Sequence, residues 1–224
     1  MLPGHDAIFV HFGYTIMASD YISNFGIDNI NGLVLDGTAF WRSRRLTAPH
    51  NSMISMKNIR QRIEIEGYRN TSDVRPFNYS PEEIFLQSGN IANSINIIYS
   101  QVHTTSYQYD PEYKVYRRYM RGIPHVDYAT GKQYTAKNII IKFVYNSNLN
   151  DPREIPNPGY QRLETIGQGR GFFITNGEYI EITWKKESRN ARTQYFDIEG
   201  NEIILNDGIT YIQVVPVDTE VVMI

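Results

Sequence analysis

The sequence predicts an α+β protein, in which a partial α/β unit at residues 1–79 precedes an antiparallel β-rich domain at residues 80–224. From about Ile91 onward, apolar and polar residues alternate, which is the pattern of half-buried strands. Asn176-Gly177 lies between two such runs and is a strong hairpin signal, because both residues tolerate positive φ. The chain opens instead with a strand-length apolar run at Asp6–Phe12 followed by a helical pattern, which indicates an α/β layer.

Two helices are expected in the first unit. One lies within Thr15–Phe25, with Gly26 behind it as a helix-ending residue. The other spans Met56–Glu66, where Ser55 can cap the first turn and Gly67 can end the last.

The second domain is expected to begin after a linker at residues 68–79. Ser80-Pro81-Glu82-Glu83 has the pattern of a capping box with proline at the first helical position, which predicts a short helix. Closely spaced turns then leave little room for crossover helices, so the sheet should be antiparallel. The main strand-like segments are Val115–Met120, Asn138–Tyr145, Gly171–Thr175, Tyr179–Trp184, Glu202–Leu205 and Thr210–Val215.

Composition excludes several classes of function. The 22 basic and 24 acidic residues give a net charge of −2, which argues against bulk electrostatic binding of nucleic acid. The absence of cysteine excludes disulfides, Cys-ligated metals and thiol nucleophiles. No apolar run approaches the roughly 20 residues that span a bilayer, and the first residues lack a signal-peptide pattern. We expect no cofactor.

Standard catalytic signatures are missing as well. There is no G-x-S-x-G, S-x-x-K or H-E-x-x-H motif, so no catalytic or metal-binding residue is predicted. The glycine run at Gly167–Gly171 leads into strand residues rather than a helix, so we interpret it as a β bulge or tight turn and not as a phosphate loop. His125-x-Asp127 could ligate a metal or relay a proton, but a locally hydrogen-bonded loop is the better interpretation.

The densest polar cluster of the chain lies in the first unit. It combines three guanidinium groups, an indole and an imidazole, which could clamp a carboxylate or phosphate while the ring stacks. The alternative is that the tryptophan and Phe40 anchor the core and the arginines only cover a surface loop. The predicted ligand-binding residues are Trp41, Arg42, Arg44, Arg45, His50 and Asn51.

A second basic patch lies at Tyr116–Arg121. Strand alternation puts Arg117 and Arg121 on one face and Arg118 on the other. One face should be core, so we expect at least one of these arginines to be paired with a carboxylate in a structural salt bridge.

Several segments recur in a known order, and the most specific of them are Ala48-Pro49-His50-Asn51 and Trp184-Lys185-Lys186. Together these segments resemble the YerB-type family, a bacterial domain-of-unknown-function family. The resemblance covers nearly the whole chain and implies an amino-terminal α/β part, a carboxy-terminal β-rich part and a location at the outer face of the cytoplasmic membrane, where a lipoprotein signal anchors members. It implies no catalytic activity or cofactor. Typical members have a further segment before the first strand, so we expect the amino-terminal domain here to be incomplete and the lipid anchor to lie outside this chain.

The leading hypothesis is a non-enzymatic cell-envelope module that binds an anionic or glycan-like ligand or a partner protein, without nucleic acid. The rival is a hydrolase or transferase acting on a cell-wall polymer, with His50 as acid/base and Asp28 or Asp127 as its partner. A third reading is architectural, with the β-rich domain docking another envelope protein along an exposed strand.

Overall fold

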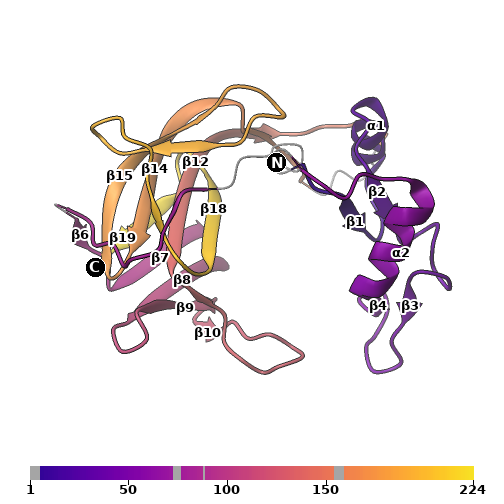
Figure 1. Ribbon diagram of the computed structural model, residues 1–224, viewed down its shortest axis with the longest axis horizontal. Coiled ribbons are helices and arrows are strands. Elements are labelled where there is room, and N and C mark those ends of the chain that lie inside the picture. The colour runs from indigo at the N-terminus through magenta and orange to yellow at the C-terminus, as the bar shows by residue number, and fades with distance from the viewer. Residues whose placement is uncertain (1–5, 73–76, 88, 154–158) are drawn as a thin grey trace. The chain divides into compact units, whose positions relative to one another are not determined.

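The computed structural model describes residues 6–72, 77–87, 89–153 and 159–224 (Figure 1). The chain divides into two compact units, each with its own core. Unit 1 holds residues 1–75 together with two segments from the second half of the chain, 148–161 and 189–192. Unit 2 holds residues 76–147, 162–188 and 193–224.

Unit 1 opens with the predicted strand and helix. Strand β1 (Phe9–His11) pairs in parallel with β2 (Asn29–Asn31), and helix α1 (Ile16–Asn24) connects them. The side chain of Thr15 caps α1 by accepting a hydrogen bond from the amide of Ala18 at 3.1 Å. This strand–helix–strand arrangement confirms the α/β start of the fold.

The second part of unit 1 is a hairpin followed by a helix. Strand β3 (Trp41–Arg42) pairs antiparallel with β4 (Ser52–Met53), and α2 (Met56–Glu66) follows. Ser55 caps α2, and Gly67 ends it at φ 67°, both as predicted. The buried core of this unit contains Ile30, Ala39 and Phe40, against which apolar residues of β1 and α2 pack, such as Val10, Ile59 and Ile63.

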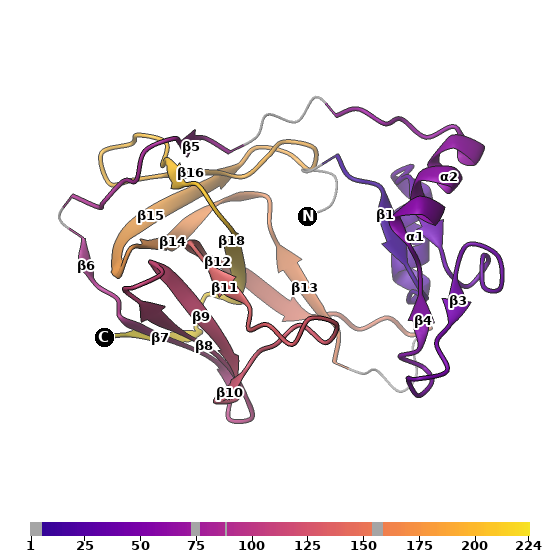
Figure 2. The ribbon, with the colours of Figure 1, turned by 60° about the horizontal axis from the view of Figure 1, so that its bottom comes forward.

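Unit 2 is built on two sheets, which are mostly antiparallel (Figure 2). The first has the order β10-β9-β8-β7-β19, with β11 on β9; the second has the order β13-β12-β14-β15-β16, with β18 on β12 and β6 on β15. The β12–β18 pair is parallel, and so is the short pair of β5 with β17.

The strands of the first sheet are β7 (Ser94–Ser100), β8 (His103–Asp110), β9 (Val115–Met120), β10 (Ile123–Pro124), β11 (Thr135–Ala136) and β19 (Glu220–Met223). Those of the second are β6 (Asn90–Ile91), β12 (Asn138–Asn148), β13 (Gln161–Glu164), β14 (Gly167–Thr175), β15 (Glu178–Lys186), β16 (Gln194–Phe196) and β18 (Thr210–Pro216), and the short pair is β5 (Tyr79–Ser80) with β17 (Leu205–Asn206).

Strand β12 has a hydrophobic core on each of its faces. Ile139 and Ile141 belong to a cluster that also contains Ile97 and Tyr107 of the first sheet, so the two sheets pack face to face. Ile140 and its same-face neighbours pack in a second cluster on the other side of the β12 sheet. Because both faces are covered, β12 is the central element of unit 2.

The predicted helix at Ser80-Pro81-Glu82-Glu83 does not form, and that prediction is wrong. Tyr79–Ser80 is instead strand β5, paired with β17. The side chain of Asn206 binds both the amide and the carbonyl of Ile84, at 2.8 and 3.0 Å, and Glu83 pairs with two lysines instead of capping a helix. These long-range contacts override the local helix signal.

The glycine run at Gly167–Gly171 lies within the regular strand β14. The pairing with β15 runs without interruption from Gly167 to Thr175, so the expected bulge or tight turn is absent. The Asn176-Gly177 hairpin is confirmed, with φ values of 52° and 82°. Two of the three glycines serve close packing: a Cβ on Gly171 would come within 2.5 Å of the carbonyl oxygen of Ile141, and one on Gly169 within 2.8 Å of the ring of Trp184. Gly167 has open space beside it and is needed instead for its φ of 112°.

Gly171→Ala is accordingly expected to lower the free energy of unfolding by about 1–3 kcal/mol, the usual cost of overpacking. The contact is with backbone of the central strand, which cannot move cheaply. Urea denaturation of the purified protein measures the change. Gln168→Ala, an exposed position on the same strand, is the control and should stay within about 0.5 kcal/mol of the wild type. Equal stability of the Gly171 variant would contradict this packing role.

Candidate functional site

All six predicted ligand-binding residues lie in the β3–β4 hairpin of unit 1. Trp41 pairs with Met53 and Arg42 with Ser52, which closes the base of the hairpin. Beyond these pairs, the amide of Ser43 donates to the carbonyl of Asn51 at 2.7 Å. The chain from 43 to 51 forms the loop of this hairpin.

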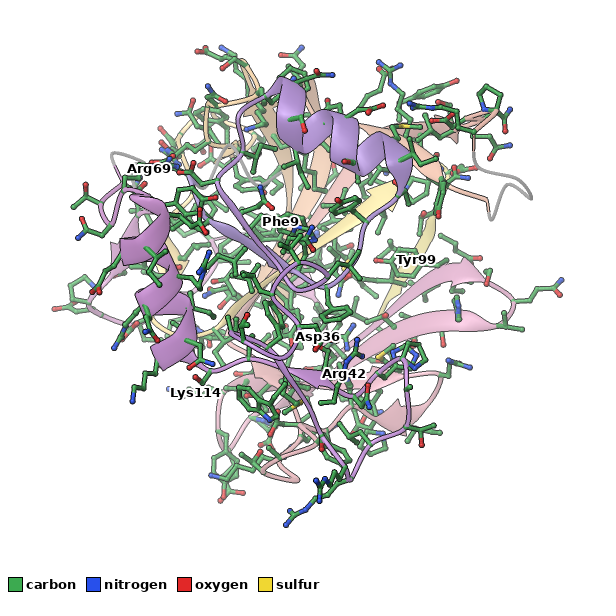
Figure 3. All side chains as sticks on the ribbon, turned by 90° about the vertical axis from the view of Figure 1, so that its right-hand side faces the viewer. Phe9, Asp36, Arg42, Arg69, Tyr99 and Lys114 are labelled. Atoms are coloured by element: carbon green, nitrogen blue, oxygen red, sulfur yellow. The ribbon has the colours of Figure 1, made fainter. Side chains whose placement is uncertain are left out.

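Arg42 is bound internally at the base of the hairpin. Its guanidinium forms an ion pair with Asp36, at 2.9 Å between Nη2 and Oδ2, and donates to Oδ1 of Asn51 at 2.9 Å. The same group lies over the ring of Phe12, 4.3 Å from its centroid. Figure 3 shows Arg42 and Asp36 side by side. Arg42 joins the hairpin to the rest of unit 1 through Asp36 and Phe12, and Asn51 supports Arg42 from within the hairpin. That Arg42 and Asn51 bind ligand stays a prediction.

Arg44, Arg45 and His50 form the exposed part of the loop. None of these three side chains makes a hydrogen bond or ion pair with another residue in the described parts of the chain. Trp41 is also exposed, at 44%, whereas its neighbour Phe40 is in the core at 4%. The alternative interpretation was that both aromatic residues anchor the core. Phe40 does so and Trp41 does not. We call Trp41, Arg44, Arg45 and His50 the cationic hairpin surface.

The electrostatics of this surface favour anions. Arg44 and Arg45 are consecutive residues of the loop, and the guanidinium group of each can donate two parallel hydrogen bonds to a carboxylate or a phosphate. The exposed indole of Trp41, at the base of the same hairpin, can pack against the apolar face of a sugar ring or an aromatic group. Exposed charges attract ligands from solution, and salt screens this attraction.

His125 and Asp127 belong to unit 2 and are used structurally. The carboxylate of Asp127 accepts hydrogen bonds from the amide and the hydroxyl of Thr130, both at 2.7 Å, and these hold its pKa below the usual value. The ring of His125 contacts the guanidinium of Arg118 and lies tilted against the ring of Tyr134, with 4.7 Å between the centroids. Burial and the charge of Arg118 lower the pKa of His125, so this ring is neutral at pH 7. Among the described residues, no three His, Asp or Glu side chains are grouped to hold a metal ion.

The second basic patch divides between its two faces. Arg117 pairs with Asp110 at 2.6 Å, which confirms a structural salt bridge. Arg118, on the core-facing side, contacts the hydroxyl of Tyr107 at 3.3 Å and His125 in place of a carboxylate. Tyr107 comes from the adjacent strand β8 and has no signal in the local sequence, whereas His125 follows seven residues after Arg118.

Sequence reasoning missed a buried lysine on β12. Lys142 is 1% exposed, and its Nζ lies 3.8 Å from the ring centroid of Trp184 and 3.3 Å from the carbonyl oxygen of Thr165. Burial, together with the nearby charge of Lys186, lowers its pKa to about 8. The signal was available, because this lysine interrupts an otherwise apolar run at Ile139–Val144.

The chain matches both domains of one protein family. Residues 1–69 match the N-terminal domain, and residues 95–212 the C-terminal domain, of the protein of unknown function DUF3048. The chain belongs to this family, whose function is unknown.

One relative of this chain carries a name. The chain is 29% identical over 216 residues to the Bacillus subtilis (strain 168) protein named "Putative lipoprotein YerB", and the match covers 95% of this chain and 62% of that protein. The chain therefore spans less than two thirds of the length of that relative. The crystal structure of YerB from Bacillus subtilis is similar with a TM-score of 0.81 and 27% identity, covering 99% of this chain and 72% of that one. These comparisons confirm the YerB-type resemblance. In the described part of the chain, no helix is both long and apolar enough to cross a membrane.

Proposed function

We propose that this protein is a non-enzymatic module of the bacterial cell envelope that binds an anionic or glycan-like ligand through the cationic hairpin surface. The observation that carries the proposal is that the cationic side chains of the hairpin differ in whether they have an internal partner. Arg42 is bound to Asp36 and Asn51, while Arg44, Arg45 and His50 are exposed without an internal partner among the described residues. Loops positioned by a fixed base commonly carry binding residues.

The envelope location rests on the relative. The Bacillus subtilis relative carries the name "Putative lipoprotein YerB", and a lipid anchor on a family member would place the module at the membrane surface. Polymers with phosphate or carboxylate groups are ligands that two adjacent arginines can bind there.

The enzymatic alternative finds little support in the geometry. The carboxylate of Asp28 is bound by Arg69 at 2.6 Å, and no hydrogen bond or ion pair joins Asp28 to His50 among the described residues. Asp127 is used by a turn of unit 2. An acid–base pair must lie within hydrogen-bond reach, about 3 Å or one water away.

Removal of the exposed cations is expected to abolish most ligand binding. The double variant Arg44→Ala/Arg45→Ala should weaken the binding of an anionic polymer at least about tenfold, which corresponds to about 1.4 kcal/mol, and His50→Ala should weaken it less. Calorimetric titration with inorganic polyphosphate and with a carboxylated oligosaccharide measures the effect, and a neutral oligosaccharide shows whether charge is needed.

The matched control is Lys57→Ala/Arg60→Ala, which removes the same charge from exposed positions on α2. This control should bind like the wild type. If it loses as much affinity as the hairpin variant, binding follows net charge and the hairpin is not the site.

Arg42→Ala should lower the melting temperature as well as the affinity, because Arg42 holds the hairpin in place.

A further inference from the structure

Unit 2 contains a groove of about 590 Å³ at the outer edge of β15. Its walls come from the segment before β7, from β14 and β15, and from the turn after β16. The volume lies within the range of sites that bind ligands or side chains of a partner. Apolar residues that line the groove include Phe85, Leu86, Phe173, Ile180, Ile198 and Ile203.

The apolar lining runs from the core to the solvent. Phe173 is buried in the second core cluster, and Leu86 and Ile203 pack against that cluster. At the mouth, by contrast, Ile198 is 94% exposed and Phe85 is 63% exposed. Large apolar side chains gathered in this way at an opening are typical of an interaction surface.

The polar lining of the groove is negative. Glu181, Asp197, Glu199 and Glu202 line it, and the described lining contains no lysine, arginine or histidine. Asp197 accepts hydrogen bonds from the amides of Glu199 and Asn201, which are neutral donors and leave its charge in place. None of Glu181, Asp197 and Glu199 forms an ion pair with a described cation. A partner of opposite charge complements such a surface.

The groove also contains a gap in strand pairing. On its outer edge, β15 pairs with β6 at Glu178 and Tyr179, and with β16 from Thr183 onward. Hydrogen-bonding groups alternate along an antiparallel strand, and the carbonyl of Gly177 accepts from Ala92 on this edge. The amide and carbonyl of Glu181 therefore point to the same edge, where no described strand pairs with them.

We infer that this groove binds an extended segment of a partner protein in which basic and apolar residues alternate. The backbone of the segment would pair with β15 at Glu181, as in other cases of strand addition. One apolar side chain would enter the groove between Phe85 and Ile198, and the neighbouring lysine or arginine would meet the carboxylates of the rim. This surface lies within unit 2 and does not depend on the cationic hairpin surface.

The test is the binding of a fluorescein-labelled decapeptide of alternating valine and lysine, measured by fluorescence anisotropy. A peptide of alternating valine and glutamate is the comparison and should bind at least about tenfold more weakly. The variant Glu181→Gln/Glu199→Gln should weaken the basic peptide about tenfold and reduce the dependence of its affinity on salt. Phe85→Ser/Ile198→Ser should weaken it similarly and leave the salt dependence unchanged.

Matched controls use exposed positions of unit 2 away from the groove. Glu112→Gln/Glu220→Gln removes the same charge, and Tyr128→Ser removes an exposed ring. Both should bind the basic peptide like the wild type. The inference is overturned if the two peptides bind equally, if the basic peptide does not bind, or if the controls lose as much affinity as the groove variants.

Two further outcomes would assign the groove to another occupant and overturn the inference. Octylammonium that displaces the peptide at a similar concentration would indicate a small amphiphilic cation as the ligand. Self-association in light scattering that Ile198→Ser abolishes, without binding of the basic peptide, would indicate a second copy of this chain.

Discussion

Asn206→Ala is expected to destabilise unit 2 by about 2–4 kcal/mol, because one buried amide side chain makes three hydrogen bonds and one of its partners has no other. Asn206 is 1% exposed, and its Oδ1 accepts from the amide of Ile84 at 2.8 Å. Its Nδ2 donates to the carbonyl of Ile84 and to the hydroxyl of Thr175, at 3.0 and 2.9 Å. Alanine would leave the amide of Ile84 without its partner, at about 1–3 kcal/mol. The carbonyl of Ile84 would keep the side chain of Asn176, and the hydroxyl of Thr175 would keep the carbonyl of Lys137, so each of these two lost bonds costs about 0.5–1.5 kcal/mol.

Urea denaturation followed by circular dichroism measures this loss. Asn93→Ala is the matched control, since Asn93 is exposed and its side chain makes no hydrogen bond among the described residues. The control should change the free energy of unfolding by less than about 0.5 kcal/mol. A loss below about 1 kcal/mol for Asn206→Ala would show that water or rearranged backbone replaces the amide.

Lys142→Met is expected to change how stability depends on pH. The pKa of Lys142 falls to about 8 in the folded protein, from a usual value of 10.5. Between these two values, the unfolded chain binds more protons than the folded protein, so the free energy of unfolding of the wild type rises with pH. The unfavourable contribution of the buried charge is therefore fully present below pH 8 and is lost as the pH approaches 10.5.

The stability of Lys142→Met relative to the wild type should thus fall by about 2 kcal/mol between pH 7 and pH 10, given 1.36 kcal/mol per pKa unit. Methionine keeps the apolar packing near Trp184, and groups that titrate in both proteins cancel in the difference. The nearby charged group is Lys186, whose pKa is lowered by burial and which is present in both proteins.

Denaturation of both proteins at pH 7, 8, 9 and 10 gives this difference directly. Lys185→Met, on the exposed face of β15, is the control and should show no such trend. A difference that is constant across the range would mean that Lys142 keeps an ordinary pKa in the folded protein.

Much of the fold follows from local signals. The helix from Ser55 to Gly67 forms where its cap residues predict it, and so does the Asn176-Gly177 hairpin. The failure at Ser80–Glu83 has a clear physical cause, because the residue that binds Ile84 is Asn206, far away in the sequence. A capping pattern contributes about 1 kcal/mol, and buried long-range hydrogen bonds outweigh it.

The candidate site could be predicted only in part. The hairpin residues are neighbours in the sequence, so their clustering follows from the chain itself. The roles within the cluster depend on Asp36, which captures Arg42 and leaves Arg44 and Arg45 exposed. The groove beside β15 could not be predicted, since three separate segments form it and each looks ordinary alone.

The binding proposal depends on Arg44 and Arg45 being free to bind an anion while Arg42 remains bound to Asp36. The most direct measurement is an NMR titration of the arginine Nε–Hε signals with inorganic polyphosphate. Saturating shifts of Arg44 and Arg45, with little change at Arg42 and Arg60, are the predicted result. Equal small shifts at all exposed arginines, or none at Arg44 and Arg45, would contradict the account.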